Sequence, residues 1–296
     1  MSEEQVTNAV VLDGEPQIVA LRRPDIKLST TPQIVVALPC GNKESATVFK
    51  CPTDEGGCGQ QWLQRGFGHP HLVPFHWVIA NMQMVPPLNC VMSYLVESGR
   101  MSAEARQIMT KKAIRMNPKY ILYWDDDTLP DPMGLYRLHA WMEMHPEAGA
   151  ISGIYTTRTD PPVPLIFEKH GQGAAWDIPM GPGTGATPIF GAGAGFLLAR
   201  IEAIVDVIAR MTAENNGVEV PIWQDMQVIT TNDACEADKF TAIWGHDVRF
   251  CRLLNEHDWP VYAHGDVICK HYDIEENKMY TVPKDAPGYV KVDDDA

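Results

Sequence analysis

The stretch Tyr120-Ile-Leu-Tyr-Trp124, followed at once by Asp125-Asp126-Asp127, decides the fold. Five apolar or aromatic residues in a row, of types that favour strands, predict a buried strand of a parallel sheet. Pro130 and Pro132 then stop the strand from continuing. Ligands of open α/β sheets bind at the carboxyl ends of the strands, so three carboxylates at this point predict a ligand site.

The three carboxylates also predict a bound cation. No basic residue stands beside them in the sequence, so they would repel one another unless a cation lay among them. The alternative is an acidic turn before the next helix, with Asp131 as N-cap and Pro132 in the first helical position. That alternative accounts for Asp131 but not for three consecutive acids after a buried strand. The metal site is therefore the favoured interpretation.

Composition describes an ordinary globular protein. The chain has 296 residues, with 45% hydrophobic and 21% charged residues, enough for a sizeable core. No apolar run reaches the roughly 18 residues of a membrane span, and the N-terminus lacks a signal-peptide pattern. Seven scattered cysteines, an odd number, indicate a reducing cytoplasm. The net charge of −14 argues against a generic nucleic-acid binder.

Strand and helix patterns alternate in the first half of the chain. We expect strands at 34–38, 90–96, 120–124 and 150–155, and helices at 75–84, 102–116 (capped by Ser102) and 133–145. This alternation predicts a parallel sheet with helices on both faces. Later elements are strands at 163–167, 174–178, 196–199, 260–263 and 267–269, helices at 201–211 and 248–256, and an irregular polar segment at 215–241.

Two segments invite other interpretations. The glycine-rich segment 180–195 has no following Lys-Ser/Thr and opens no first βα unit, so ATP P-loop and NAD sites are rejected. Residues 42–74 contain Cys51, Cys58, His69 and His71, which could form a zinc site. The cysteine spacing is longer than usual for zinc, so we favour a surface loop.

An ordered set of motifs resembles a known family. Its members are Pro39 after the first strand, Ala105-Arg106-Gln107, the Asp-x-Asp of Asp125–Asp127, Gly193-Ala-Gly195, His246-Asp247 and a closing His271. This set is similar to that of GT-A-fold glycosyltransferases of the family-2-like type, found in bacteria and their phages. The resemblance implies an α/β fold with a mostly parallel central sheet flanked by helices, and a smaller antiparallel sheet on the acceptor side.

The resemblance also implies a domain organisation. Residues 33–273 would form one catalytic domain, with a nucleotide-sugar half at 33–158, an acceptor half at 159–273 and an inserted loop at 42–74. Residues 1–32 would be an N-terminal arm and 274–296 a C-terminal tail. The expected location is the cytoplasm, or the host cytoplasm if the chain is phage-encoded, and the oligomeric state is left open.

The implied reaction moves a sugar from a nucleotide diphosphate, such as a UDP- or GDP-sugar, with Mn²⁺ or Mg²⁺ on the diphosphate. Carboxylate oxygens with one imidazole suit Mn²⁺ well. Arg106 lies in the first turn of its helix, where a donor-facing role and a surface salt bridge are both open. The donor is expected to contact Pro39, Arg106, Asp125 and Asp126, and the metal to contact Asp125, Asp127 and His271.

The catalytic base is left open between two neighbours. Asp247 matches the family's acidic pair, whereas His246 stands where the first acid is usual. Either could take the acceptor proton, or the reaction could be retaining with neither in that role. Simple helix capping is the alternative for Asp247, and an ordinary buried histidine is the alternative for His271.

The acceptor site is the least defined. Trp223, Trp244 and Gly193 are its candidates, since tryptophans supply stacking platforms, although the tryptophans could equally be core. A glycan, a small molecule and a modified DNA base all remain open, the last requiring a basic groove at Arg65, Lys111, Lys112 and Arg115.

Two other functional classes are also considered. One is a nucleotidyl or phosphoryl enzyme, which lacks here its usual glycine and lysine cradle. The other is a sugar- or nucleotide-binding module without transferase activity, which the complete set of acids and His271 disfavours.

Overall fold

The computed structural model describes residues 9–12, 15–18, 33–40, 74–88, 90–98, 100–169, 176–231 and 239–290. The chain divides into two compact units, Met1–Thr31 and Pro32–Ala296. The first unit contains an antiparallel hairpin of β1 (Ala9–Leu12) and β2 (Glu15–Ile18). The proposed zinc residues, Arg65 and nearly all of the 42–74 loop lie outside the described residues.

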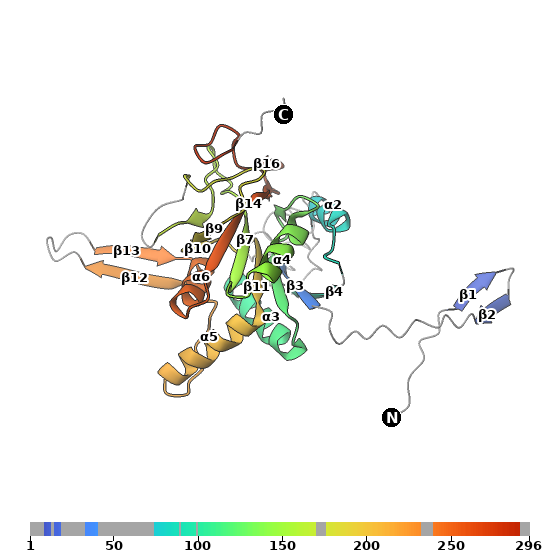
Figure 1. The fold of residues 1–296 in the computed structure, drawn as a ribbon, viewed down its shortest axis with the longest axis horizontal. Coiled ribbons are helices and arrows are strands. Elements are labelled where there is room, and N and C mark those ends of the chain that lie inside the picture. The colour runs from blue at the N-terminus through green and yellow to red at the C-terminus, as the bar shows by residue number, and fades with distance from the viewer. Residues whose placement is uncertain are drawn as a thin grey trace, which may run out of the picture. The chain divides into compact units, whose positions relative to one another are not determined.

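A seven-stranded sheet forms the centre of the second unit (Figure 1). Its order is β4 (Val91–Ser98), β3 (Gln33–Cys40), β5 (Tyr120–Trp124), β11 (Phe196–Arg200), β7 (Ala150–Ile154), β14 (Val261–Ile268) and β9 (Ala186–Ile189). β11 and β9 run antiparallel to their neighbours, and the other strands share one direction. The sheet is thus mostly parallel, as the GT-A resemblance implies.

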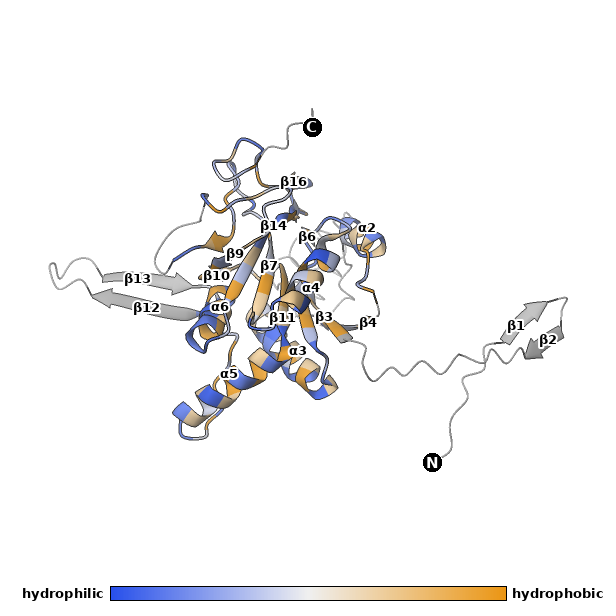
Figure 2. Cartoon of the chain, viewed as in Figure 1, coloured by the Kyte–Doolittle hydropathy of each residue, from blue (hydrophilic) through white to orange (hydrophobic). Residues whose placement is uncertain are grey.

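Helices cover both faces of this sheet because its strands are apolar on both sides. In β5, Ile121 and Tyr123 join one hydrophobic cluster, and Tyr120, Leu122 and Trp124 join the other. The first cluster is completed by α3 (Ser102–Met116), α5 (Ile201–Glu214) and α6 (His246–Glu256), and the second by α2 (Phe75–Gln83) and α4 (Gly134–Met144). Figure 2 shows mostly orange central strands and helices striped in blue and orange.

A three-stranded sheet beside the centre positions a key histidine. It consists of β6 (Thr128–Leu129), β15 (Lys270–Asp273) and β16 (Lys278–Tyr280). Its ladder pairs His271 with Thr128, and the backbone N–H of Tyr272 donates to the carbonyl of Asp127. The closing histidine is therefore held directly beside the Asp-rich stretch.

Two further strand pairs lie outside these sheets. β8 (Ile166–Phe167) pairs with β10 (Gly191–Ala192), so the strand expected at 163–167 is shorter than predicted and the glycine-rich segment contributes strands. β12 (Met226–Thr231) and β13 (Lys239–Trp244) form a hairpin where an irregular segment was expected. That prediction was wrong, because β-branched residues favour strands even within a segment that is polar overall.

Other boundaries also differ from the prediction. The strands expected at 260–263 and 267–269 form the single strand β14, with a register shift between His264 and Ile268. Residues 176–178 form no strand. Met101, and not Ser102, is the N-cap of α3, and no side chain caps this helix.

The segment expected to be a C-terminal tail takes part in the packing as far as Val290. Tyr280 and Val282 are only 5% and 3% exposed, and the backbone N–H of Val290 donates to the carbonyl of Met180. Within the described residues, no helix has the length and apolar character needed to cross a membrane.

Candidate functional site

The candidate site lies at the carboxyl end of β5, where the chain passes from a buried strand into Asp125. The antiparallel strand β11 begins at this point, with Phe196 paired to Trp124. The backbone N–H of Asp125 donates to the carbonyl of Gly195 at 2.9 Å. Strand pairing thus brings the Gly193–Gly195 segment against the Asp-rich stretch.

Arg106 supplies the positive charge beside Asp125. Its Nη2 donates to both carboxylate oxygens of Asp125, at 2.6 and 2.7 Å, and the residue is only 2% exposed. Burial works to lower the pKa of the guanidinium, but the charges of Asp125 and Asp247 raise it overall. No basic residue stands beside these carboxylates in the sequence, but α3 brings Arg106, 19 positions earlier, against Asp125.

Burial and ion pairing act in opposite directions on Asp125. Burial raises the pKa of its carboxyl group, while the charge of Arg106 opposes that rise. Arg106 is therefore neither a surface salt bridge nor a side chain open to a ligand in this structure. It forms an ion pair with Asp125, in which a single nitrogen, Nη2, reaches both carboxylate oxygens.

The start of α6 brings His246 and Asp247 to the same place. His246 Nε2 is hydrogen-bonded to Nη1 of Arg106, and the backbone N–H of Ala194 donates to Asp247 Oδ2 at 3.2 Å. Gly245 is the N-cap of α6, so Asp247 does not cap the helix. Burial would raise the pKa of Asp247, but the charge of Arg106 lowers it below its usual value. Asp247 is thus a carboxylate, with 23% of its side chain exposed.

Asp127 and His271 form a second pair. Oδ2 of Asp127 lies 3.2 Å from Nε2 of His271, and Arg158 approaches the same oxygen at 3.4 Å. Burial opposes ionisation of both groups. Even so, His271 lowers the pKa of Asp127, and Asp127 raises the pKa of His271.

The pair fits a divalent metal in its donor chemistry. Nδ1 of His271 lies 2.6 Å from the carbonyl of Thr156, which can only accept, so Nε2 is the nitrogen left to bind a metal. The hydroxyls of Thr128 and Thr156 are buried, with no hydrogen-bond partner among the described residues. Asp125, however, faces Arg106. In the described part of the chain, no three His, Cys, Asp or Glu side chains cluster closely enough to hold a metal.

Tyr155 is a site residue that the sequence analysis missed. Its hydroxyl accepts from the backbone N–H of Gly195 at 3.0 Å, and its ring meets that of His271 edge-on at 5.4 Å. Burial, with Asp125 and Asp247, raises its pKa well above the usual value. Its position at the carboxyl end of a predicted strand was the available signal.

Gly193 lies where no side chain fits. A Cβ built on it would meet the hydroxyl oxygen of Tyr155 at 2.1 Å, so the glycine allows the backbone to pass over that ring. Gly193 thus packs closely on Tyr155, and its acceptor contact stays a prediction.

Trp223 packs in the core. It is 3% exposed, stacks on Phe250 with ring centroids 4.2 Å apart, and donates from Nε1 to Thr110 at 3.1 Å. Its faces are therefore covered by other side chains. The side chain of Trp244 lies outside the described part of the chain.

The remaining predicted donor contacts are placed as follows. Pro39 is buried near the end of β3, where it pairs with Glu97. Asp126 is half-buried beside Asp125. A further missed residue, Asp225, accepts from the backbone N–H of His246 at 3.0 Å.

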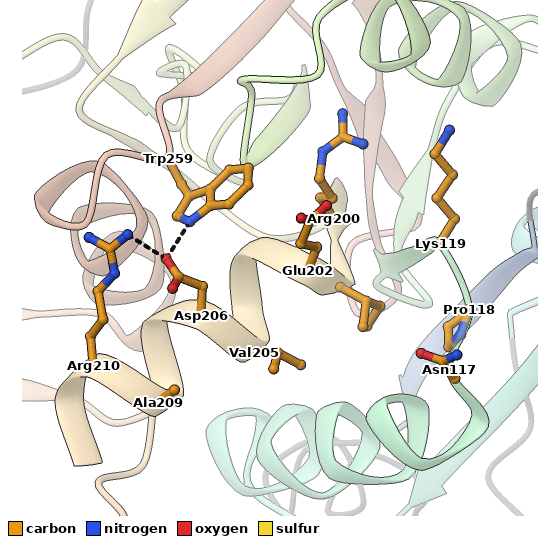
Figure 3. Close-up of a pocket in the computed structure, with 11 residues that line it drawn as sticks. Asn117, Pro118, Lys119, Arg200, Glu202, Val205, Asp206, Ala209, Arg210 and Trp259 are labelled. Carbon is orange, nitrogen blue, oxygen red and sulfur yellow. Dashed lines mark hydrogen bonds and ion pairs between the residues drawn. The ribbon is translucent and has the colours of Figure 1, made fainter. Parts of the chain in front are cut away.

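A pocket of about 710 Å³ lies elsewhere (Figure 3). Two of its residues, Lys119 and Trp259, precede β5 and β14, so the pocket is at the amino ends of the parallel strands. Within it, Asp206 accepts from Nε1 of Trp259 and from Arg210, both at 2.9 Å. Because ligands of such sheets bind at the opposite edge, we assign the candidate site to the Asp125 region.

No family model and no curated protein sequence matches the chain. Among the solved structures that resemble it, A197 from STIV is 13% identical with a TM-score of 0.46, covering 90% of this chain and 100% of that one. S. aureus TarS 1–349 is 10% identical with a TM-score of 0.34, covering 79% of this chain and 58% of that one. Likenesses at this level assign neither an activity nor a residue role.

Proposed function

We propose that the chain is a metal-dependent glycosyltransferase that moves a sugar from a nucleoside-diphosphate donor to a hydroxyl group. The observation that carries this proposal is the meeting of two separate acidic centres at the carboxyl end of β5. One is Asp127 with His271, and the other is Asp247 beside Arg106. The partner of Asp127 is an imidazole and that of Asp247 is a guanidinium, so we assign the first centre to metal binding and the second to proton transfer.

The donor side would be built on Asp127 and His271. These two residues would hold Mn²⁺ or Mg²⁺, which when bound supplies positive charge to the departing diphosphate. Asp125 is fixed by Arg106 and would hydrogen-bond the nucleotide of a UDP- or GDP-sugar, leaving Asp127 as the carboxylate for the metal. Pro39, at the end of β3, would border the base.

The acceptor side would be built on Asp247. Its pKa is lowered, so it is ionised at neutral pH, and its partly exposed side chain can reach an acceptor hydroxyl. In the transfer, the acceptor oxygen bonds to the anomeric carbon as that carbon's bond to phosphate breaks. The hydroxyl proton passes to Asp247. Nε2 of His246 already accepts from Arg106, which favours Asp247 as the base.

The acceptor proposed here is a sugar or small-molecule hydroxyl. A modified DNA base would need a basic groove, but Lys111 pairs with Glu219 and Lys112 pairs with Glu97, both at 2.8 Å. These lysines are therefore partly neutralised within the chain, whose net charge is −14.

The test is turnover of UDP- and GDP-sugars with Mn²⁺, measured as release of the nucleoside diphosphate. Asp247→Asn is expected to lower the rate by about 100-fold or more, the scale of a lost general base, with little change in the Kd for the nucleoside diphosphate. Asp258→Asn, an exposed carboxylate outside the site, is the matched control. Turnover of no sugar nucleotide by the wild type, or a wild-type rate for Asp247→Asn, would refute the proposal.

A further inference from the structure

The base of the β12–β13 hairpin brings together Asp225 and His246, neither of which has a step in the proposed reaction. Met226 pairs with Trp244 at its base, so Asp225 and Gly245-His246 emerge side by side. Oδ1 of Asp225 accepts from the backbone N–H of His246 at 3.0 Å and lies 3.2 Å from its Nδ1. Figure 1 shows β13 leading directly into α6, which begins at His246.

The neighbours of His246 select one tautomer. Asp225 as a carboxylate can only accept, so Nδ1 carries the proton. Nη1 of Arg106 can only donate, so Nε2 presents its lone pair to the guanidinium. The hydroxyl of Ser102 also lies 3.3 Å from Nε2. Oδ1 of Asp247, 3.5 Å from Nε2, is the other charged group on that side.

Arg106 depends on this acceptor. It is 2% exposed, and its Nε already lacks a partner among the described residues. A further donor left unpaired on a buried guanidinium would carry a desolvation cost. His246 thus accepts a hydrogen bond from Nη1 of Arg106, while Nη2 of Arg106 donates to Asp125.

We propose that Asp225 is a positioning residue that fixes His246 as a neutral acceptor, and through it keeps Arg106 on Asp125. The effect on transfer rests on the proposed function, whereas the tautomer of His246 does not. His246 is therefore not the base. It connects α6 to the Arg106–Asp125 pair, and Asp247 takes the acceptor proton.

The first experiment is imidazole nitrogen NMR on the full chain, labelled with ¹⁵N. The chain has ten histidines, so the His246 signal is assigned as the one missing in His246→Gln. We expect His246 to carry its proton on Nδ1 in the wild type, and its ring-nitrogen signals to shift in Asp225→Ala, because Nδ1 then loses its carboxylate acceptor. Gln224→Ala, a change at the exposed neighbour, should leave the signal unchanged. Protonation on Nε2 in the wild type, or an unchanged signal in Asp225→Ala, would overturn the proposal.

The second experiment compares variants by turnover of the donor. Asp225→Ala and His246→Ala should each lower kcat/KM about tenfold or more, the scale of a lost hydrogen bond to a charged group. The double variant should be no slower than His246→Ala, because the two residues act through one contact. Melting temperatures identify any variant that fails to fold, and the NMR measurement stands even if no sugar nucleotide is turned over.

His246→Gln separates a positioning role from a base. Its carbonyl oxygen can accept from Arg106, but its amide cannot take a proton from the acceptor. Positioning predicts that Gln recovers a large part of the activity lost in Ala and keeps the pH profile of the wild type. Activity as low as in His246→Ala, with one limb of the pH profile lost, would instead make His246 the base.

Discussion

Asp125 and Asp127, separated by one residue, have different partners at this site. Asp125 is locked to a guanidinium by two hydrogen bonds, whereas Asp127 faces an imidazole that a backbone carbonyl orients. A metal binding at Asp127 must compete with the proton on His271, since only the neutral imidazole is a ligand. The Asp125 pair involves no such competition.

Metal affinity should therefore depend on pH. The pKa of His271 is raised above its ordinary value, so its imidazole remains protonated further into the neutral range than a free histidine. Affinity for Mn²⁺ should fall as the pH drops through that raised pKa, and below it about one proton should be released per metal bound. Calorimetry in two buffers of different ionisation enthalpy measures the proton. His271→Gln should remove the release, and release of no proton by the wild type would contradict this assignment.

At the scale of elements, the Gly193–Gly195 segment and the end of β7 act as one unit. Tyr155 lies under the segment, accepts from Gly195, and packs against His271. The same segment donates from Ala194 to Asp247. One backbone segment thus contacts Asp247 directly and approaches His271 through Tyr155.

Gly193→Ala should destabilise the protein and disturb Asp247. The new Cβ would lie 2.1 Å from the hydroxyl oxygen of Tyr155, and that ring is buried, so the backbone must move. The expected cost is about 1–3 kcal/mol in the free energy of unfolding, the usual scale of overpacking. Urea denaturation measures it. Gly134→Ala, whose nearest contact would be 3.2 Å, is the milder control.

A second variant tests the cause of that loss. Tyr155→Phe removes the closest atom but leaves the ring carbon that a Cβ would meet at 2.8 Å. The double variant should lose less stability than the sum of the two single changes. Strict additivity would show that the tyrosine hydroxyl is not what Gly193 avoids.

The elements themselves were largely predictable from the sequence, but their partners were not. The apolar run at 120–124 and the helical pattern at 102–116 are local signals, and both elements form where they were expected. The contact of Arg106 with Asp125 joins α3 to the end of β5, and no periodic pattern in the sequence indicates it. The pairing of Asp225 with His246 depends on a hairpin whose polar sequence hid its strands. Tyr155, in contrast, stands at the carboxyl end of the strand predicted at 150–155, a position that could have marked it as a site residue.

At the scale of the molecule, the second unit contains both hydrophobic clusters and the whole candidate site. Its last described residues contribute to it, since Val282 belongs to the larger cluster. A domain ending at Asp273, as the sequence suggested, would therefore lose part of its core.

Two truncations test this organisation. Removing residues 1–31 should leave the melting temperature of the remainder nearly unchanged, because the second unit has its own core. Ending the chain after Asp273 should lower it by several degrees, because Tyr280 and Val282 are lost from buried positions. The measurement is the melting temperature of each truncated chain, compared with that of the full chain. Equal losses from the two would contradict the assignment of the core.

The most direct test of the account is thermal unfolding with UDP, GDP, CDP or ADP, each with and without Mn²⁺. A ligand present at about 100 times its Kd stabilises the native state by roughly 2.7 kcal/mol, which is several degrees for a chain of this size. The account predicts a rise with one nucleoside diphosphate only when Mn²⁺ is present, lost in Asp127→Asn and kept in Asp258→Asn. If no nucleotide raises the melting temperature under either condition, or if Asp127→Asn responds as the wild type does, the donor site is not at Asp127 and His271.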